Sequence, residues 1–474
     1  MKKLLLLLAL PFSAAAQTDP VPRLDAYLRS AVDVAEFNGN VLIAKGGKVI
    51  YQRSFGYHDF RSRLPLDSDS RFEIGLVTQQ FTAAAVLLLV ERHQLKLTDK
   101  ITDLFPSLPY KTITIADLLT SSSGLPEFYE EVMKDKWKEQ RLATNADIIR
   151  YLSQQNVPLH FQPGQSSEET GTGFALLASV IEKISGLSYA SFMDRNIFIP
   201  LRLEHTKTWL GAHVHKVADA GLAAALPYDE LAGKYLQPDS LSPAFAGLFA
   251  GILPITDSIA GVSNISSTTG DLLRWDQALK NHTLLGKEVQ EEMFAQHVLA
   301  DKTSKIYAAF GTKIGRNELG DFVMVQEAGN FTLGYSTALI RYTGTDITLI
   351  VLCNKGKEGI SQQICGALSY IVHDREVVPL YIHREMAIDP ALLDRYVGKY
   401  LLPNPIELVK KEGRLYRQME GSPDVQLHPE SPIKFFYGPE TGDTQLEFQT
   451  DAQGNVVKAW YIGMGLKKEI TRVP

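Results

Sequence analysis

The spacing of hydrophobic positions changes several times along the chain, and each change predicts a different kind of element. Apolar residues recur at helical intervals from Arg23 to Ala35. The next two runs, GNVLIAK and KVIYQRSFG, meet at Gly46 and Gly47, which predicts two short strands joined by a turn. From Ile101 to about Leu279 the apolar spacing is mainly helical. The first half of the chain therefore predicts a helix, two strands and a long helical region.

Three apolar runs follow the helical region and predict strands. They cover Phe322–Gln326, Tyr335–Arg341 and Ile347–Cys353. A closing helix is predicted from about Gly359 to His373. Helices at both ends of this region, with strands between them, predict an α+β fold. In that fold an antiparallel sheet is flanked by helices and carries a helical insert.

The pattern changes again at about Leu392. Short alternating runs, such as IELVKKEGRLYRQ and TQLEFQTDAQGNVVKAWYIG, are separated by turns rich in Gly, Pro and Asp. This spacing is typical of an all-β unit, a small barrel or a sandwich. Aromatic residues in strands more often belong to a core than to a ligand site. We therefore expect core positions at Tyr396, Tyr400, Phe435 and Phe436.

The segment Phe72–Ala83 reads FEIGLVTQQFTA and is the most informative motif of the chain. It resembles the active-site helix of the serine β-lactamase and penicillin-binding-protein family, where the run is close to FxIGSVTKQFTA. The resemblance places the family's nucleophilic Ser at Leu76 and its Lys at Gln79. Residues three apart share a helix face, so the family's Lys amine can reach its Ser hydroxyl. Leucine has no nucleophilic atom and a Gln amide is neutral, so this chemistry is missing here.

Three further motif frames follow in the order that the family has them. PGQSSEETGTGFALLASVIE, from Pro163, resembles a segment with a family Tyr-x-Asn and holds Glu169 and Gly171 at those positions. LLTSSSGLP resembles LLTHTSGLP, with Ser121 in place of the His. VQEAGNFTLGYST resembles the strand that carries a His-x-Gly, and Glu327 stands at the His position. The frames are kept while the residues that carry chemistry differ.

The resemblance covers roughly residues 25–375 and implies a β-lactamase/transpeptidase-like domain. The C-terminal unit resembles the lipocalin-like domain that is often appended to this family in bacterial envelope proteins. We therefore expect a signal peptide over 1–16, a β-lactamase-related domain over 20–375, a linker over 376–388 and a β domain over 389–474.

The first residues, MKKLLLLLALPFSAAA, combine two lysines, an apolar run and small residues. This order is typical of a secretory signal, with cleavage after Ala16. The apolar run is shorter than the roughly 18 residues that span a bilayer, so we expect no transmembrane anchor after cleavage. Loss of Lys2 and Lys3 would take the formal net charge from −6 to −8. The predicted location is periplasmic or extracellular.

Composition excludes several classes of function. A chain of 474 residues, 45% hydrophobic and 22% charged, is long enough for two globular domains. Its negative charge argues against a nucleic-acid partner. It has no Walker-type, GxGxxG, HExxH or paired CxxC motif, so we expect no cofactor and no metal. Cys353 and Cys365 either form a disulfide, which an oxidising compartment permits, or are separate buried thiols.

Five positions that carry chemistry or line the cleft in the family are replaced, and these are Leu76, Gln79, Glu169, Gly171 and Glu327. Gln79 removes a positive charge, while Glu169 and Glu327 add two negative ones. A cleft that both carboxylates face should prefer ammonium groups. The first hypothesis is therefore a pseudoenzyme that binds an amine-bearing ligand, such as a cell-wall peptide. The expected ligand contacts are Gln79, Glu169, Glu327, Ser121 and Asn330.

Two alternatives stay open. The chain could be an active hydrolase that uses other residues, with Glu169 and Glu327 as an acid–base pair. Thr78 is a poor nucleophile candidate because it points about 200° around the helix from Leu76. In the other alternative, the C-terminal β unit is an interaction module and the large domain is its scaffold. The sequence predicts neither the ligand nor the oligomeric state.

Overall fold

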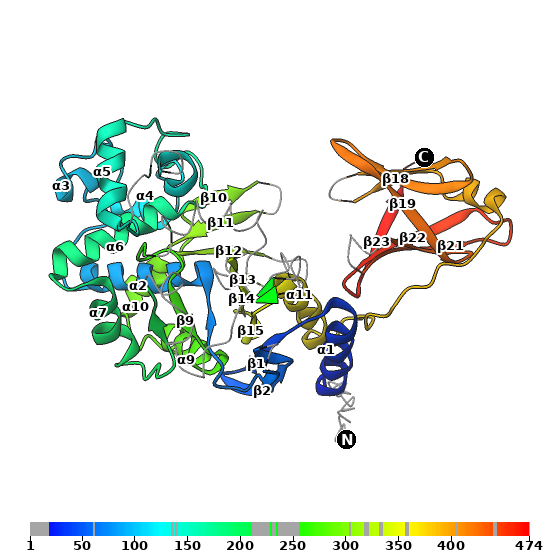
Figure 1. Ribbon diagram of the computed structural model, residues 1–474, viewed down its shortest axis with the longest axis horizontal. Coiled ribbons are helices and arrows are strands. Elements are labelled where there is room, and N and C mark those ends of the chain that lie inside the picture. The colour runs from blue at the N-terminus through cyan, green and yellow to red at the C-terminus, as the bar shows by residue number, and fades with distance from the viewer. Residues whose placement is uncertain are drawn as a thin grey trace, which may run out of the picture.

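One antiparallel sheet of eight strands forms the centre of the larger part of the molecule (Figure 1). The computed structural model describes residues 19–59, 62–133, 137, 141–210, 228–229, 234–235, 256, 258–302, 305–316, 322–330, 335–355, 360–402, 405–438 and 443–473. For 59, 130–132, 228–229, 234–235 and 322–330 it describes the backbone alone.

The order of the strands places the start of the chain beside its later part. The order is β10-β11-β12-β13-β14-β15-β1-β2, and β1 pairs with β15 so that Val41 lies opposite Val351. The bounds are β1 Gly39–Lys45, β2 Lys48–Phe55, β10 Val298–Asp301, β11 Ile306–Ala309, β12 Thr312–Arg316, β13 Phe322–Asn330, β14 Tyr335–Tyr342 and β15 Ile347–Cys353. Every predicted strand of the large domain is confirmed, and β13 extends four residues beyond its predicted end.

The central strands are buried on both faces, which explains their continuous apolar sequence. In β1, Leu42 and Ala44 belong to the hydrophobic cluster on one side of the sheet, whereas Val41 and Ile43 belong to the cluster on the other side. Successive side chains of a strand point to opposite faces, so a strand covered on both faces must be apolar throughout. All seven residues of β15 are buried in the same way.

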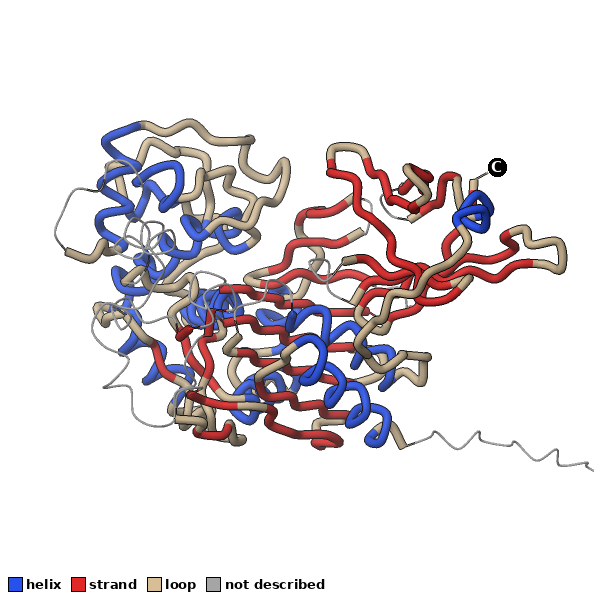
Figure 2. The backbone as a smooth tube through the Cα atoms, turned by 45° about the vertical axis from the view of Figure 1, so that its right-hand side comes forward, coloured by secondary structure: helices blue, strands red, loops and turns tan. Residues whose placement is uncertain are grey.

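Helices cover both faces of this sheet (Figure 2). On one face, α1 (Val21–Ala35) and α11 (Ile360–Val372) share a hydrophobic cluster with the sheet. On the other face lie α2 (Thr78–Glu91) and α9 (Thr269–Lys280). The buried residues of α2 run without a break from Thr78 to Leu89, which makes it the central helix of the larger cluster. The α+β prediction is confirmed.

The predicted helical insert is present between β5 and β10, but it also contains short strands. Its helices are α3 Ile101–Leu104, α4 Ile115–Leu119, η2 Phe128–Met133, α5 Asn145–Gln155, α6 Gly171–Ser185, α7 Tyr189–Met193, η3 Asp194–Phe198 and, after α9, α10 Lys287–Met293. β5 (Phe72–Glu73), β6 (Lys207–Thr208) and β9 (Ile265–Ser267) form a small sheet. The remaining short strands are β3 Tyr57–Asp59 with β4 Leu64–Pro65, and β7 Tyr228–Asp229 with β8 Lys234–Tyr235. Strands of two or three residues are too short to give a period, so the sequence did not predict them.

The C-terminal part of the chain forms a closed antiparallel barrel of eight strands. The strands are β16 Gly398–Leu401, β17 Ile406–Lys411, β18 Arg414–Met419, β19 Ser422–Ser431, β20 Lys434–Tyr437, β21 Thr444–Thr450, β22 Val456–Gly463 and β23 Leu466–Arg472, preceded by η7 Pro390–Arg395. Tyr396, Tyr400 and Phe435 fill its core together with Phe448. The barrel and the core role of these aromatic residues are confirmed, whereas Phe436 stacks on His383 instead.

The barrel is joined to the large domain through the turn between β22 and β23. The hydroxyl of Tyr27 in α1 donates to the carbonyl of Met464 at 3.1 Å, and Met464 belongs to the cluster of α1 and α11. Gly465 has a φ of 78°, and a Cβ there would lie 2.2 Å from the carbonyl oxygen of Val378. Only glycine fits this turn without displacing the neighbouring chain.

Residues 376–388, predicted to be a linker, contribute a polar cluster that we call the junction cluster. Its centre is His383, whose Nδ1 lies 3.2 Å from Glu430 and whose Nε2 lies 2.6 Å from Asp443. The Tyr381 hydroxyl donates to Glu430 at 2.7 Å and also receives a hydrogen bond from Lys434. Among the described residues, none of the buried polar side-chain atoms in this cluster lacks a partner.

The structure bears differently on the predicted signal peptide and on the two cysteines. The predicted signal peptide, residues 1–16, lies outside the described residues. Among the residues that the structure does describe, no helix has the length and apolar character needed to cross a bilayer. Cys353 in β15 and Cys365 in α11 are both buried and form no disulfide among the described residues, which agrees with the interpretation as two separate thiols. Burial raises the pKa of the Cys353 thiol above its ordinary value.

Candidate functional site

The turn that enters α2 carries the two most informative family positions. Leu76 lies in the short helical turn η1 (Gly75–Val77), and Gln79 is the second residue of α2. Gly75 has a φ of 50°, a left-handed conformation that glycine adopts without strain. β13 packs against this turn, and the half-buried Leu76 packs against the larger hydrophobic cluster. Position 76 therefore supplies packing and no nucleophilic atom.

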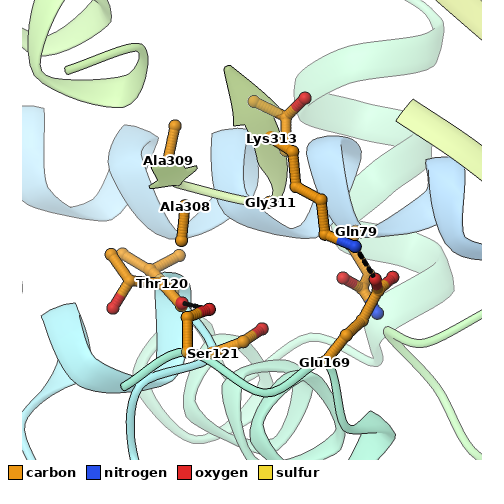
Figure 3. A pocket seen from close by; sticks show the side chains of 11 residues that line it. Gln79, Thr120, Ser121, Glu169, Ala308, Ala309, Gly311 and Lys313 are labelled. Carbon is orange, nitrogen blue, oxygen red and sulfur yellow. Dashed lines mark hydrogen bonds and ion pairs between the residues drawn. The ribbon is translucent and has the colours of Figure 1, made fainter. Parts of the chain in front are cut away.

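A pocket lies next to this turn, and Gln79 forms part of its wall (Figure 3). It holds about 490 Å³ of empty space, including the part that opens to solvent. The predicted residues Gln79, Ser121 and Glu169 meet here, whereas Leu76 and Gly171 are not among its lining residues. The complete lining is Gln79, Leu119, Thr120, Ser121, Ser167, Glu169, Ala308, Ala309, Gly311, Thr312 and Lys313.

An ion pair crosses this pocket. The Lys313 ammonium, on β12, lies 2.6 Å from a carboxylate oxygen of Glu169, which precedes α6 (Figure 3). The Lys313 side chain is 50% exposed and that of Glu169 is 28% exposed. The sequence prediction of an ammonium-selective cleft assumed that the Glu169 charge is uncompensated. In the structure Lys313 compensates the charge of Glu169, and the side chain of Glu327, on which the hypothesis also depends, lies outside the described part of the structure.

The Gln79 side chain is buried, and its amide nitrogen is unusual among the described residues. Gln79 is 3% exposed, and its Nε2 has no hydrogen-bond partner among the residues that the structure describes. The next residue differs, since Oε1 of the buried Gln80 accepts a hydrogen bond from the Trp275 indole at 3.3 Å. A buried donor without a partner is unfavourable, and most buried polar groups in folded proteins are paired. A hydrogen-bond acceptor on a ligand that reached the Gln79 Nε2 would therefore form a favourable contact.

Gly171, at the position of the family's Asn, has no room for a side chain. A Cβ there would lie 2.9 Å from the Phe128 ring and 3.1 Å from Val262. The Gly171 N–H donates to a carboxylate oxygen of Glu127 at 2.6 Å. Because this N–H starts α6, the Glu127 carboxylate satisfies an otherwise orphaned donor and also faces the positive end of the helix. The Asn position has become part of a helix cap.

Several hydroxyl groups surround the pocket. Ser121 lines it and has a φ of 52°, which is unusual for a residue with a Cβ. The Ser167 hydroxyl donates to the Thr120 carbonyl at 2.9 Å. Thr78, considered as an alternative nucleophile, is completely buried. It is therefore not accessible to a substrate in this conformation.

Two of the predicted contacts lie where only the backbone is described. Glu327 and Asn330 are both in β13, opposite Ala338 and Tyr335 of β14. Their side chains lie outside the described part of the structure, as does the whole of Phe331. The structure therefore places their strand beside η1 and leaves their contacts as predictions.

The sheet order, the central helix α2 and the strand β13 beside its entry turn define the fold of β-lactamases and penicillin-binding proteins. The family model described as Beta-lactamase matches residues 25–364, and the chain belongs to this family. The match starts at the predicted start of the resemblance, residue 25, and ends 11 residues before its predicted end at about residue 375.

Individual relatives agree with this assignment. The chain is 32% identical over 424 residues to penicillin-binding protein 4* of Bacillus subtilis (strain 168), which covers 88% of this chain and 91% of that protein. The octameric penicillin-binding protein homologue from Pyrococcus abyssi has a TM-score of 0.65 at 20% identity, covering 95% of this chain and 100% of that one. The penicillin-binding protein from Bacillus halodurans has a TM-score of 0.61 at 21% identity, and the match covers 73% of this chain and 99% of that one. These two structures show the shared fold.

Lys313 is the site residue that sequence reasoning missed. It lies on β12, and none of the strands β10, β11 and β12 was predicted. The segment IYAAFGTKIGR does alternate in part, with Ile314 buried between the exposed Lys313 and the exposed Arg316, but Gly311 and Gly315 interrupt the pattern. Even a correct strand prediction would not have paired it with Glu169, which is 144 residues away in sequence.

Proposed function

We propose that this protein binds a ligand reversibly in the altered cleft and forms no acyl-enzyme. The observation that carries the proposal is Leu76 at the position of the family's nucleophile, followed by Gln79 at the position of its Lys. A family Ser needs a base within hydrogen-bond reach, and here both members of that pair are replaced. Loss of the nucleophile alone costs about a millionfold in turnover in a serine hydrolase.

The composition of the pocket supports a binding role. Small-molecule sites are concave and largely apolar, with a few polar groups that orient the ligand. Here Leu119, Ala308 and Ala309 supply apolar wall, and the Gln79 amide and the Lys313–Glu169 pair supply the polar groups. The hydrolase alternative gains no support from this arrangement, because Lys313 holds the Glu169 carboxylate as a paired anion.

We further propose that the protein is exported and that its ligand comes from the cell envelope. The lysines, apolar run and small residues at the start of the chain support export. The Bacillus subtilis relative is, by its name, a penicillin-binding protein. We propose that this protein still binds a peptide-like ligand in the cleft but is not acylated by it.

The proposal is tested by steady-state hydrolysis of a chromogenic ester and a chromogenic β-lactam. The wild-type protein should show no turnover above a protein-free blank. Leu76→Ser with Gln79→Lys should restore measurable ester hydrolysis, because the turn and helix that present these positions are retained. Saturable wild-type hydrolysis that persists in a Leu76→Ala variant would overturn the proposal.

A fuller restoration needs one precaution. Gly171→Asn would place its Cβ 2.9 Å from the Phe128 ring, so this substitution is expected to destabilise the protein. Glu169→Tyr is the better third change, since Glu169 is part-exposed at the pocket edge. A triple variant without Gly171→Asn separates loss of fold from loss of chemistry.

A further inference from the structure

The pocket presents three charged or polar groups with complementary requirements. The Gln79 Nε2 is a buried donor without a partner in the described structure, and Gln79 lines the pocket. Lys313 offers a cation and Glu169 an anion, 2.6 Å apart at the same pocket. A ligand that uses all three must carry an oxygen acceptor, a negative group and a positive group close together.

The ion pair can open at low cost. Lys313 is 50% and Glu169 28% exposed, so water screens their attraction and an ion pair of this kind contributes little to stability. A ligand with a single charge would satisfy one member and leave the other without its partner. A ligand with both charges replaces one ion pair by two, which selects zwitterions over monovalent ions of the same size.

An oxygen acceptor on the ligand would give the Gln79 amide its hydrogen-bond partner. A carboxylate placed beside Lys313 has two oxygens, and one of them can accept from the Gln79 amide. This contact removes the cost of a buried donor without a partner. The Gln79 contact should therefore contribute more to affinity than the exposed ion pair does.

The rest of the wall limits the size of the ligand. Ala308 and Ala309 are 5% and 2% exposed and, with Leu119, form an apolar surface. The Ser121 side chain adds a hydroxyl. Because part of the 490 Å³ of empty space is open solvent, these walls enclose only a small group.

We infer that this pocket recognises an α-ammonium carboxylate group with a small apolar substituent, its carboxylate held by Gln79 and Lys313 and its ammonium by Glu169. A free amino acid carries this group, and so does a peptide side chain that ends in an amino-acid centre. The inference rests on the proposed function, because it describes reversible occupation of a cleft that forms no covalent bond.

Binding is measured by calorimetry and ligand-observed NMR, with alanine as the probe. Propionate and ethylammonium are matched controls that each carry one of the two charges. Diaminopimelic acid distinguishes a side-chain source, because it carries the same zwitterion at the end of a longer chain. Alanine should bind about tenfold or more tightly than either single-charge control. Equal affinity for alanine and propionate, or no binding by alanine or diaminopimelic acid, would overturn the inference.

Variants locate the site. Gln79→Leu and Lys313→Met should each weaken alanine binding about tenfold or more, while thermal unfolding shows that both variants are folded. Lys458→Met is the matched control, because the Lys458 side chain on the barrel is 49% exposed, close to the value for Lys313, and pairs with Glu469 at 3.4 Å. Unchanged alanine affinity in both pocket variants would contradict the assignment. Acylation of the wild-type protein is scored separately, by its mass, so failure of this inference and failure of the proposed function give different results.

Discussion

The pocket at Gln79 and the junction cluster at His383 are both polar groups set against hydrophobic cores, and they differ in how their atoms are paired. In the junction cluster His383 is held between Glu430 and Asp443, with side chains 11%, 18% and 2% exposed. In the pocket the ion pair is far more exposed, and the Gln79 Nε2 has no partner among the described residues.

This difference indicates two different roles. A buried network in which every member is satisfied fixes one arrangement of the chain, because any change leaves a charge or donor unpaired. A pocket with a weak ion pair and an unpaired donor loses little when it rearranges, and gains a hydrogen bond when a suitable group enters. We therefore interpret the junction cluster as structural and the pocket as a ligand site. The predictions below test this contrast.

The largest effect is expected at the centre of the junction cluster. His383→Ala leaves the Glu430 and Asp443 carboxylates without their shared partner in a buried setting, and should lower the free energy of unfolding by roughly 3–5 kcal/mol. Urea unfolding measures this. His428→Ala is the control, because His428 also pairs with a carboxylate, Glu385 at 3.0 Å, but this pair is more accessible, with side chains 26% and 54% exposed. A His383 variant as stable as the control would contradict the structural role.

The same histidine predicts a pH dependence. Burial alone would lower the pKa of His383, but the hydrogen bonds to Asp443 and Glu430 outweigh it and raise the pKa above its ordinary 6.5. The groups that face the ring are Asp443, Glu430, Tyr381 and, through Glu430, Lys434. A neutral imidazole has one N–H, so one carboxylate loses its donor on deprotonation.

The sign of the effect follows from that raised pKa. The stability that His383 contributes is fully present below pH 6.5 and is lost as the pH rises through the folded-state pKa. The difference in unfolding free energy between wild type and His383→Ala should therefore shrink at alkaline pH. The ring protons of His383 in NMR should titrate with a midpoint above 6.5, and a midpoint at or below it would refute the prediction.

Substitutions at the neighbouring residues Gln79 and Gln80 should change the free energy of unfolding by smaller amounts and in opposite directions. Gln79→Leu removes a buried donor that has no partner in the described part of the chain, and should stabilise the protein by about 1 kcal/mol. Gln80→Leu removes the acceptor of the Trp275 indole and should destabilise it by about 1–2 kcal/mol. Chemical denaturation of both variants checks the signs. Destabilisation by Gln79→Leu would mean that the amide has a structural role and would weaken the ligand-site interpretation.

The smallest effect on stability is expected at the ion pair of the pocket. Lys313→Met should change the free energy of unfolding by less than about 1 kcal/mol, because the pair is exposed and screened. Glu169→Gln is the matched variant on the other side. A loss of several kcal/mol in either would show that the pair holds the pocket walls together, and would remove the contrast with the junction cluster.

The sequence predicted those parts of the molecule whose pattern is local. β1 and β15 are apolar on both faces and were found from their runs, and the frame around Leu76 was found from its motif. β10, β11 and β12 were missed because they are only four or five residues long, and β12 also contains Gly315. Their burial is uneven, so their hydrophobic pattern is weak.

The partners of the site residues could not be predicted because they depend on packing between distant segments. Glu169 was identified as a cleft residue, but its partner could not be named because Lys313 comes from a strand 144 residues later. His383 likewise meets Asp443, 60 residues away. No local pattern marks either pair. Gly171 was identified as a replaced Asn, while its part in capping α6 through Glu127 required the structure.

The most direct test of a cleft that binds without acylation is the mass of the intact protein after incubation with an acylating β-lactam and with a fluorophosphonate. The wild-type mass should stay unchanged, while the variant with Leu76→Ser and Gln79→Lys should gain the mass of one adduct. A stoichiometric adduct on the wild-type protein, mapped by peptide sequencing to any residue of the pocket or of the segment Phe72–Ala83, would contradict the account.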